Sequence, residues 1–314
     1  MTAVSAMIEG DGPLLVFGGP YGNLQATDAV LAAAAERGLP PSRIVCTGDL
    51  VAYCGDPVTT IARIREAGIH VVMGNCDEQL AAGSDDCGCG FPEGGACDRL
   101  SSAWFGCVDR EVGARDRAWL AALPRSLDAR IGGRRLRVVH GGVDVINRFI
   151  FATSPLDEKR RQLALAAADG CHGIVGGHCG MPFTQIIDGR LWHNAGVAGM
   201  PANDGTPRGW YSVLTPGRSA IEITHHAFDY DHRAAMEAMA RGGYPAEYRA
   251  ALESGTWPSC DVLTAHERTI QGVALVPGTV RWMASERRPG MSAAWPQWPV
   301  PLTAGEAAAS AACC

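Results

Sequence analysis

Four polar side chains stand directly after short apolar runs of the sequence, and their chemical types suit metal binding. They are Asp49, Asn75, His140 and His178. Each has a glycine beside it, and glycine permits the tight turns and the close backbone approach that a ligand loop needs. If the apolar runs are strands of one structure, these side chains can converge beyond the strand ends.

This set offers one carboxylate, one amide oxygen and two imidazoles, which suit a divalent ion of borderline hardness such as zinc, manganese or iron. Taken singly, each residue has a plainer interpretation. An aspartate after glycine is often a turn residue or a helix cap, and a histidine near a strand end often has a structural role. The joint pattern, repeated in order at strand ends, favours a metal site.

The stretch Gly74-Asn75-Cys76-Asp77 combines two kinds of ligand chemistry. It follows the apolar run His70–Met73, which predicts a buried strand, so we expect Asn75 on a loop at the end of that strand. An amide oxygen is a hard ligand, whereas the neighbouring thiol of Cys76 is a soft one. The sequence therefore predicts a metal ligand at this point and leaves open whether it suits a hard or a soft metal ion.

The cysteine content is high, with 12 cysteines in 314 residues. Without a secretion signal, a disulfide framework is the weaker interpretation. Many of these residues can be buried small hydrophobes, and the glycine-rich stretch 84–97 can be a surface insert with reduced thiols. The alternative is that thiols near the motifs act as ligands, and the candidates are Cys54, Cys87, Cys89, Cys97 and Cys179.

The elements that must position these residues alternate between strands and helices. Short apolar strands near 13–17, 44–46 and 70–73 are separated by helical patterns over 24–37 and 58–67, which predicts βαβ units and a largely parallel central sheet. Ligands of such sheets gather beyond the carboxyl ends of the strands. Helices are further expected over 98–105, 109–123 and 155–169, with a short helical turn over 78–83.

The domain organisation follows from the same patterns. Residues 1–268 are predicted to form one domain that carries the cysteine-rich loop 84–97 and a helical pair over 230–254. Residues 269–314 are predicted to be a C-terminal extension that ends in a tail rich in proline and alanine.

Composition excludes some partners. The net charge of -6 gives no nucleic-acid or anionic-membrane footprint. No apolar run approaches the roughly 18 residues that span a bilayer, and residues 1–12 lack the pattern of a signal peptide. We therefore expect a cytoplasmic protein without nucleic-acid or membrane partners.

The order of the motifs resembles the calcineurin-like metallophosphoesterase family, and in particular its bacterial branch. The motifs are Gly22-Asn23-Leu24, Gly48-Asp49, Gly74-Asn75, His140-Gly141, Gly177-His178 and Asn194-Ala195-Gly196, within residues 13–255. The resemblance implies an α/β fold, a four-layer α/β/β/α sandwich with its site at the strand ends. It also implies metal-assisted attack of hydroxide on a phosphoric ester.

The departures from the family's motifs fall mainly on one metal. Where the family has Asp-x-His, this chain has Gly19 and Tyr21, and where its Gly-His-x-His ends in a ligand, this chain has Gly180. The ligands that the resemblance assigns to the other metal, Asp49, Asn75, His140 and His178, are all present. The resemblance therefore implies one divalent ion (Zn, Mn or Fe) rather than two.

The family's catalytic histidine is replaced by Cys76. The resemblance implies that Cys76 and Asp49 are the catalytic residues and that Asn23 and Asn194 contact the substrate or support the ligands. Tyr21, which stands in place of a family ligand, can hydrogen-bond a substrate, ligate iron(III) or simply pack in the core. A thiol with a pKa near about 8.5 can donate a proton at neutral pH but matches that task less well than histidine.

Two functions remain open at this level. One is a metal-dependent hydrolase of small phosphorylated molecules with an atypical, single-metal site. The other is a non-hydrolytic protein on the same scaffold that binds or senses a metal or a metalloid compound through the cysteines of the site.

Overall fold

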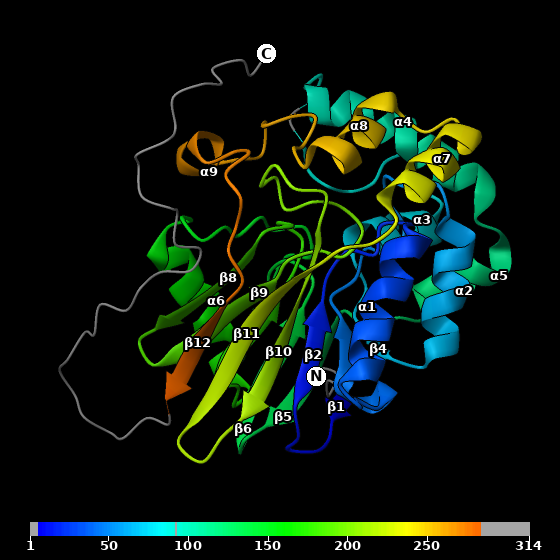
Figure 1. Ribbon diagram of the computed structural model, residues 1–314. Helices are drawn as coiled ribbons and strands as arrows, with labels where there is room; N and C mark the ends of the chain where they lie inside the picture. The colour runs from blue at the N-terminus through cyan, green and yellow to red at the C-terminus, as the bar shows by residue number, and fades with distance from the viewer. Residues whose placement is uncertain (1–5, 92, 284–314) are drawn as a thin grey trace.

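The structure is a computed structural model that describes residues 6–91 and 93–283. It contains two six-stranded sheets, and Figure 1 shows them packed face to face, one in front of the other, with the helices on the outer faces. The first sheet holds β1 (Ala6–Ile8), β5 (Ser126–Ile131), β6 (Arg134–Val139), β7 (Gly173–Gly176), β8 (Pro182–Ile187) and β9 (Arg190–Ala195). The second holds β2 (Leu14–Phe17), β3 (Ile44–Cys46), β4 (His70–Val71), β10 (Gly209–Pro216), β11 (Ala220–Phe228) and β12 (Gly278–Met283).

The helices are mostly short and lie between the strands in the sequence. They are α1 (Leu24–Glu36), α2 (Pro57–Ala67), α3 (Asn75–Ala82), α4 (Ala96–Glu111), α5 (Ala114–Ala121), α6 (Leu156–Ala168), α7 (His232–Gly242), α8 (Ala246–Ser254) and α9 (Ala265–Thr269), with a 3-10 turn at Pro41–Arg43. No helix in the described ranges is both long and apolar enough to cross a membrane.

Both sheets are mixed. The first has the order β1-β5-β6-β7-β9-β8, and the second has the order β12-β11-β10-β2-β3-β4. Parallel pairing joins β2 to β3 and β3 to β4, as the βαβ pattern predicts, whereas β10 pairs antiparallel with β2 and β11. The predicted largely parallel sheet is therefore wrong, because later hairpins extend the sheets with antiparallel strands.

The four-layer α/β/β/α sandwich that the resemblance implied is confirmed by the packing of the two sheets. Strand β2 illustrates it, because side chains of a strand alternate between its two faces. Leu14 and Val16 lie in the core between the sheets, whereas Leu15 and Phe17 lie in the core beneath the helices. On the other side, Leu163 of α6 packs in a third core against the first sheet.

Two helices differ from their sequence-based predictions. Helix α3 begins at Asn75 itself, so Asn75 occupies the first turn of a helix and not a loop. Helix α4 runs through Gly106, where the sequence predicted a break. The reason is its apolar stripe, with Trp104 and Val108 fully buried, because tertiary burial outweighs the roughly 1 kcal/mol that glycine costs a helix.

The C-terminal region has structure within the part assigned to an extension. Strand β12 pairs antiparallel with β11, and Trp282 on β12 is buried in the core between the sheets. The helical pair expected over 230–254 is present as α7 and α8. The predicted Pro/Ala-rich tail falls on residues 284–314, which lie outside the described residues.

Candidate metal centre

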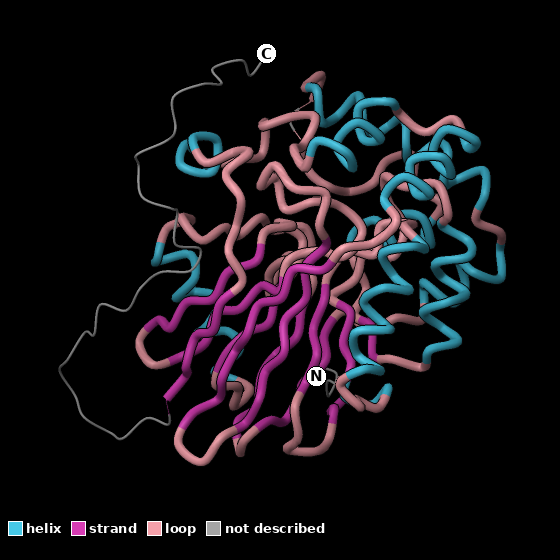
Figure 2. The backbone as a smooth tube through the Cα atoms, in the orientation of Figure 1, coloured by secondary structure: helices cyan, strands magenta, loops and turns pink. Residues whose placement is uncertain are grey.

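The candidate ligands are gathered where loops leave one end of both sheets, as Figure 2 shows for the loops above the strands. Asp49 follows β3 and Asn75 follows β4 in the second sheet, whereas His140 follows β6 and His178 follows β7 in the first. All four side chains are buried. The structure therefore brings together the four residues that the sequence selected, two from each sheet.

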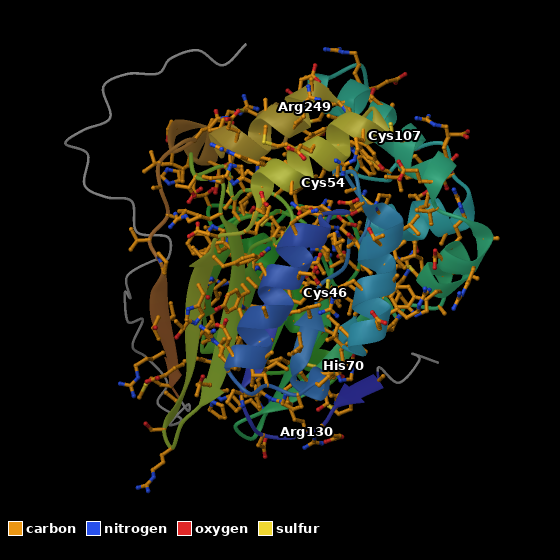
Figure 3. The ribbon with its side chains drawn as sticks, turned by 45° about the vertical axis from the view of Figure 1, so that its right-hand side comes forward. Cys46, Cys54, His70, Cys107, Arg130 and Arg249 are labelled. Atoms are coloured by element: carbon orange, nitrogen blue, oxygen red, sulfur yellow. The ribbon has the colours of Figure 1, made fainter. Side chains whose placement is uncertain are left out.

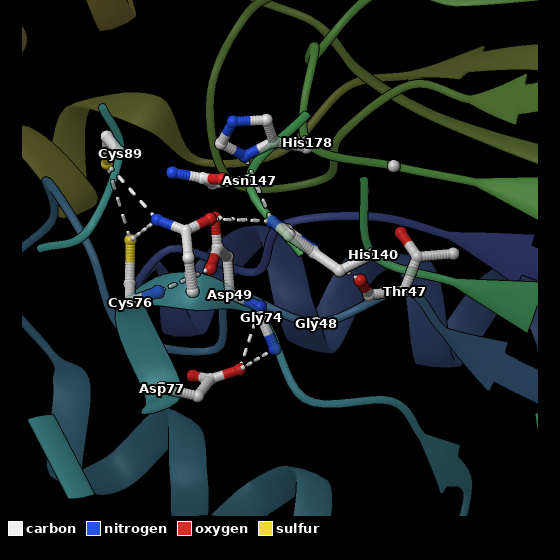
Figure 4. Close-up of polar contacts among 12 residues, drawn as sticks. Thr47, Gly48, Asp49, Gly74, Cys76, Asp77, Cys89, His140, Asn147 and His178 are labelled. Carbon is white, nitrogen blue, oxygen red and sulfur yellow. Dashed lines mark hydrogen bonds and ion pairs between the residues drawn. The ribbon is translucent and has the colours of Figure 1, made fainter. Parts of the chain in front are cut away.

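Their donor atoms converge on the ring nitrogen Nε2 of His140 (Figure 4). That atom lies 3.0 Å from Oδ1 of Asn75, 3.1 Å from Nδ1 of His178 and 3.2 Å from Oδ2 of Asp49. Ligand atoms on one ion at bond lengths of about 2.1 Å lie roughly 3.0–3.4 Å apart. The spacing of these donors is thus that of a coordination shell.

Hydrogen bonding alone cannot satisfy these four groups. Nδ1 of His140 lies 2.7 Å from the carbonyl oxygen of Thr47, which only accepts, so Nδ1 carries the proton in the neutral ring. Nε2 then faces Asp49, Asn75 and His178 with a lone pair. One further proton, on Nε2 of His140 or on Nδ1 of His178, would serve only one of these contacts, whereas a divalent cation would serve all of them. The residues therefore fit a metal ion.

The protonation states also suit metal binding. Burial lowers the pKa of His178 to about 3, with a further contribution from His140, so this ring is neutral at physiological pH. Burial alone would raise the pKa of Asp49, but His140 and His178 lower it below its ordinary value. Burial would lower the pKa of His140, but Asp49 raises it overall. Asp49 is therefore a carboxylate beside the neutral ring of His178, and it favours a positive charge at His140, which a bound cation would supply in place of the proton.

Two of the ligands have unusual backbone conformations. Asp49 has φ 56° and His178 has φ 61°, which is the left-handed region that side-chain-bearing residues rarely adopt. Such conformations are retained where the surrounding structure enforces them, and they cluster at functional sites. Here they turn both side chains into the space between the two sheets' strand ends.

Asp77 holds the Asp49 loop in place, and the sequence reasoning assigned it no role. Its carboxylate accepts hydrogen bonds from the backbone N–H groups of Gly74, Asp49 and Leu50, each at 2.9 Å. The pKa of Asp77 is raised to about 7 by burial and by Asp49. A signal was present in the sequence, because an acidic residue at the third position of a helix often bonds back to the N-cap amide.

Two asparagines singled out from the sequence support the loops. Asn194 donates to the carbonyl oxygen of Gly177 at 2.8 Å and to Sγ of Cys179 at 3.1 Å, and it thereby braces the loop that carries His178. Asn23 caps α1 through the N–H of Ala26 and donates to the carbonyl oxygen of Gly199. The contacts of Asn23 thus lie at the start of α1 and not at the donor cluster.

A cavity of about 70 Å³ adjoins Asp49 and His178. Its wall is largely aromatic, and none of the described residues that line it is a lysine or an arginine. The lining includes Tyr21, Tyr53, Phe91, Phe149, Tyr248 and Trp257, together with Cys89 and Cys97. Burial, and then the nearby Asp49, raises the pKa of Tyr21 well above its ordinary value, so Tyr21 is a phenol hydrogen-bond donor at the cavity.

The cysteines of the motifs separate into two groups. Sγ of Cys54 contacts the carbonyl oxygen of Gly199, and the thiol of Cys179 donates to the carbonyl oxygen of Met181. Neither of these contacts involves another thiol. Cys76, Cys87 and Cys89, in contrast, lie together beside Asn75. Cys97 lines the cavity but is held through its backbone N–H by Asp261.

Comparison with known sequences identifies the family. The sequence profile of the calcineurin-like phosphoesterase superfamily domain matches residues 22–216, which is more than half of the chain. The chain belongs to this superfamily. A search of curated proteins finds no match. At the level of the superfamily, the chain is thus a metallophosphoesterase-like protein with a possible metal site at Asp49, His140 and His178.

Two solved structures share this phosphoesterase fold. The crystal structure of hypothetical protein PH1004 from Pyrococcus horikoshii OT3 is similar with a TM-score of 0.66 and 18% identity, covering 78% of this chain and 99% of that chain. A metallophosphoesterase from Sphaerobacter thermophilus is similar with a TM-score of 0.59 and 22% identity, covering 79% of this chain and 100% of that chain. At these identities the likeness shows the fold.

Proposed function

We propose that this chain is a metal-dependent hydrolase of phosphoric esters that uses a single divalent ion. The observation that carries the proposal is a buried group of four lone-pair donors, Nε2 of His140 and the three atoms around it, which joins the ends of both sheets. Asp49, Asn75, His140 and His178 would hold the ion. When bound, the ion would supply Lewis acidity and a more acidic water.

The chain's own residues would orient and bind the substrate. Thr47 keeps His140 in the tautomer that presents Nε2, and Asp49 remains ionised beside it. The hydroxyl of Tyr21 stays protonated and is available to donate a hydrogen bond to an ester oxygen in the cavity. The aromatic wall excludes water from the ester, which strengthens these polar contacts.

Cys76 is less suited to proton transfer than its position in the motif suggests. Its side chain is fully buried, is not part of the cavity wall, and has a pKa raised well above its ordinary value, first by burial. We therefore propose slow turnover, with solvent in place of Cys76 as the source of the proton for the leaving group, because the pKa of Tyr21 is also raised well above its ordinary value.

The cavity favours an ester of low charge. Because neither lysine nor arginine lines it and Asp49 does, a phosphate monoester dianion would have no cationic side chain to pair with. A diester carries one negative charge, and an aryl group on it would pack against Tyr53, Phe149 and Trp257. We propose small phosphodiesters with an apolar substituent as substrates.

We also propose a cytoplasmic location for the protein, which the free thiols of the described cysteines support.

The test compares hydrolysis of bis(4-nitrophenyl) phosphate and 4-nitrophenyl phosphate by protein stripped of metal and then given zinc, manganese or iron(II). We expect metal-dependent activity with preference for the diester. Asp49→Asn should lower kcat/KM by at least about 100-fold, because it replaces the one anionic ligand among the four by a neutral amide. Asp116→Asn, in an ion pair with Arg65 near the surface, is the matched control. Activity that persists without metal, or in Asp49→Asn, would refute the proposal.

A further inference from the structure

A cluster of three thiols lies next to the metal centre and outside it. Sγ of Cys89 is 2.6 Å from Sγ of Cys87 and 4.0 Å from Sγ of Cys76. Cys76 comes from the first turn of α3, whereas the other two flank Gly88 in the loop between α3 and α4. All three are free thiols and are buried. The hydrolytic proposal assigns no task to this cluster.

The loop that carries Cys87 and Cys89 is fixed in place by two asparagines. Asn75 donates through Nδ2 to the carbonyl oxygen of Cys87 at 2.9 Å and to Sγ of Cys89 at 3.3 Å. On the other side, Asn147 donates to the carbonyl oxygen of Gly88 at 2.7 Å. Gly88 has φ +64°, which turns the chain so that both flanking sulfurs face Cys76. The convergence of the thiols is therefore built into the loop.

The other buried cysteines within residues 6–91 and 93–283 do not cluster in this way. Cys46, Cys54 and Cys107 lie spread along the helix-covered side of the molecule (Figure 3). Their sulfurs approach backbone carbonyl oxygens at 3.6–4.0 Å, which is the ordinary behaviour of a cysteine packed as a small hydrophobe. Figure 4 shows the contrast, with Cys76 and Cys89 facing each other beside the centre.

Charge decides which ion such a cluster can hold. Among the described residues, the three sulfurs contact one another, Asn75, the carbonyl oxygen of Cys87 and Ser101, and none of these contacts is with a lysine or an arginine. The backbone N–H of Cys76 donates to the Asp49 carboxylate at 3.1 Å, so a negative charge is already close by. Three thiolates on a divalent ion would add a further buried negative charge, which is costly. Three thiolates on a trivalent centre would add none.

We propose that Cys76, Cys87 and Cys89 form a binding site for a trivalent thiophilic metalloid, held as a neutral tris-thiolate. With arsenite as the ligand, As(OH)3 and three thiols give As(SR)3 and three waters. Three As–S bonds form while three As–O bonds and three S–H bonds break, and each proton leaves with a hydroxide. No electron is transferred. The ligand reaches the cluster through Cys89, which lines the aromatic cavity.

The first experiment uses arsenite alone, with the full chain reduced by a phosphine rather than by a competing thiol. We expect one arsenic per chain after gel filtration. Cys76→Ala, Cys87→Ser and Cys89→Ser should each weaken binding by at least about 100-fold, since losing even an outer-shell partner costs roughly 10–100-fold in metal affinity. Cys97→Ser, which alters a thiol of the same cavity outside the cluster, should bind like the unaltered chain.

A second measurement needs no variant of the cluster. X-ray absorption at the arsenic edge of the loaded, unaltered protein should show three sulfur neighbours and no oxygen. An arsenic coordinated by two sulfurs and one oxygen would indicate a two-thiol site and overturn the proposal. Arsenite binding by Cys76→Ala that is as tight as that of the unaltered chain would do the same. Tighter binding of zinc than of arsenite at the cluster would overturn the charge argument.

The metalloid site stands independently of the hydrolytic proposal. Asp49→Asn should abolish metal-dependent hydrolysis yet bind arsenite as the unaltered chain does, because an asparagine oxygen can still accept from the N–H of Cys76. Loss of arsenite binding in Asp49→Asn would place the arsenic at the oxygen and nitrogen ligands and refute the thiol site. If Asp49→Asn loses hydrolysis and neither this variant nor the unaltered chain binds arsenite, the hydrolytic proposal stands and the metalloid site is refuted.

Discussion

Asp77 shows how one side chain can fix the position of another without touching the substrate. Its two carboxylate oxygens accept from three backbone N–H groups, two of which belong to Asp49 and Leu50. Those bonds hold Asp49 in its left-handed conformation. An ionised carboxylate can accept all three because it has about four lone-pair sites. Asp77 is therefore a positioning residue for the metal centre.

We predict that Asp77→Asn lowers the affinity for a divalent ion by roughly 10–100-fold. The amide has one accepting oxygen, and its NH2 group would face a backbone N–H, leaving at least one donor buried and unpaired. Metal affinity is measured by competition with a coloured chelator. Glu78→Gln is the control, because it neutralises the next residue of the same helix, which pairs with Arg125 at the surface. Equal affinities in both variants would remove the positioning role.

The residues that the sequence could predict are those with ligand chemistry of their own. Asp49, Asn75, His140 and His178 were selected by type and by place after apolar runs, and the structure brings them together. Asp77 and Thr47 could not be selected in that way, because their partners are backbone groups and a ring nitrogen that only the folded loops bring near. The grouping of Cys87 and Cys89 with Cys76 likewise depends on the turn at Gly88.

At the scale of elements, the start of α3 decides where two ligands lie. The N-cap Gly74 has an ordinary extended conformation, with φ -88°, so its importance is steric and not conformational. A Cβ at this position would collide with the side chain and the backbone nitrogen of Asp49. The helix can therefore begin this close to the Asp49 loop only with glycine at its N-cap.

We predict that Gly74→Ala displaces Asp49 and weakens binding of the divalent ion by at least about 10-fold, with a loss of roughly 1–3 kcal/mol in the free energy of unfolding from overpacking. Gly113→Ala is a closely matched control. Gly113 is the N-cap of α5 with φ -80°, and a Cβ there would meet nothing within 4 Å. Calorimetric metal titration and urea unfolding compare the two variants. Equal effects would show that the crowding at Gly74 has no consequence for the centre.

Element predictions failed where tertiary contacts outweigh local signals. Gly106 reads as a helix break, but the buried Trp104 and Val108 hold α4 continuous around it. Gly74-Asn75 is predicted to be a loop, but the carboxylate of Asp77 accepts from the N–H of the N-cap Gly74, and helix α3 therefore begins at Asn75. Strands β2, β3 and β4 were predicted well because their apolar runs and the intervening helices are local features of the sequence.

At the scale of the whole molecule, the four candidate ligands join the two sheets. Asp49 and Asn75 belong to loops of the second sheet, and His140 and His178 to loops of the first. The sheets also share a core that contains Leu14, Val45 and Leu136. An ion held by all four ligands can therefore bind only when both sheets are folded and packed, which couples its binding to global stability.

We predict that manganese raises the melting temperature of the metal-free protein. An ion present at about 100 times its Kd stabilises the native state by about 2.7 kcal/mol, which for a chain of this size corresponds to a shift of roughly 4–5 °C. Manganese is chosen because it prefers oxygen and nitrogen ligands to thiols, so Cys76, Cys87 and Cys89 contribute little. Calorimetric melting in manganese and in chelator measures the shift. Asp49→Asn replaces the one anionic ligand by a neutral amide and should therefore show a much smaller shift. A full shift in that variant would mean that manganese stabilises the protein from somewhere other than the junction of the two sheets.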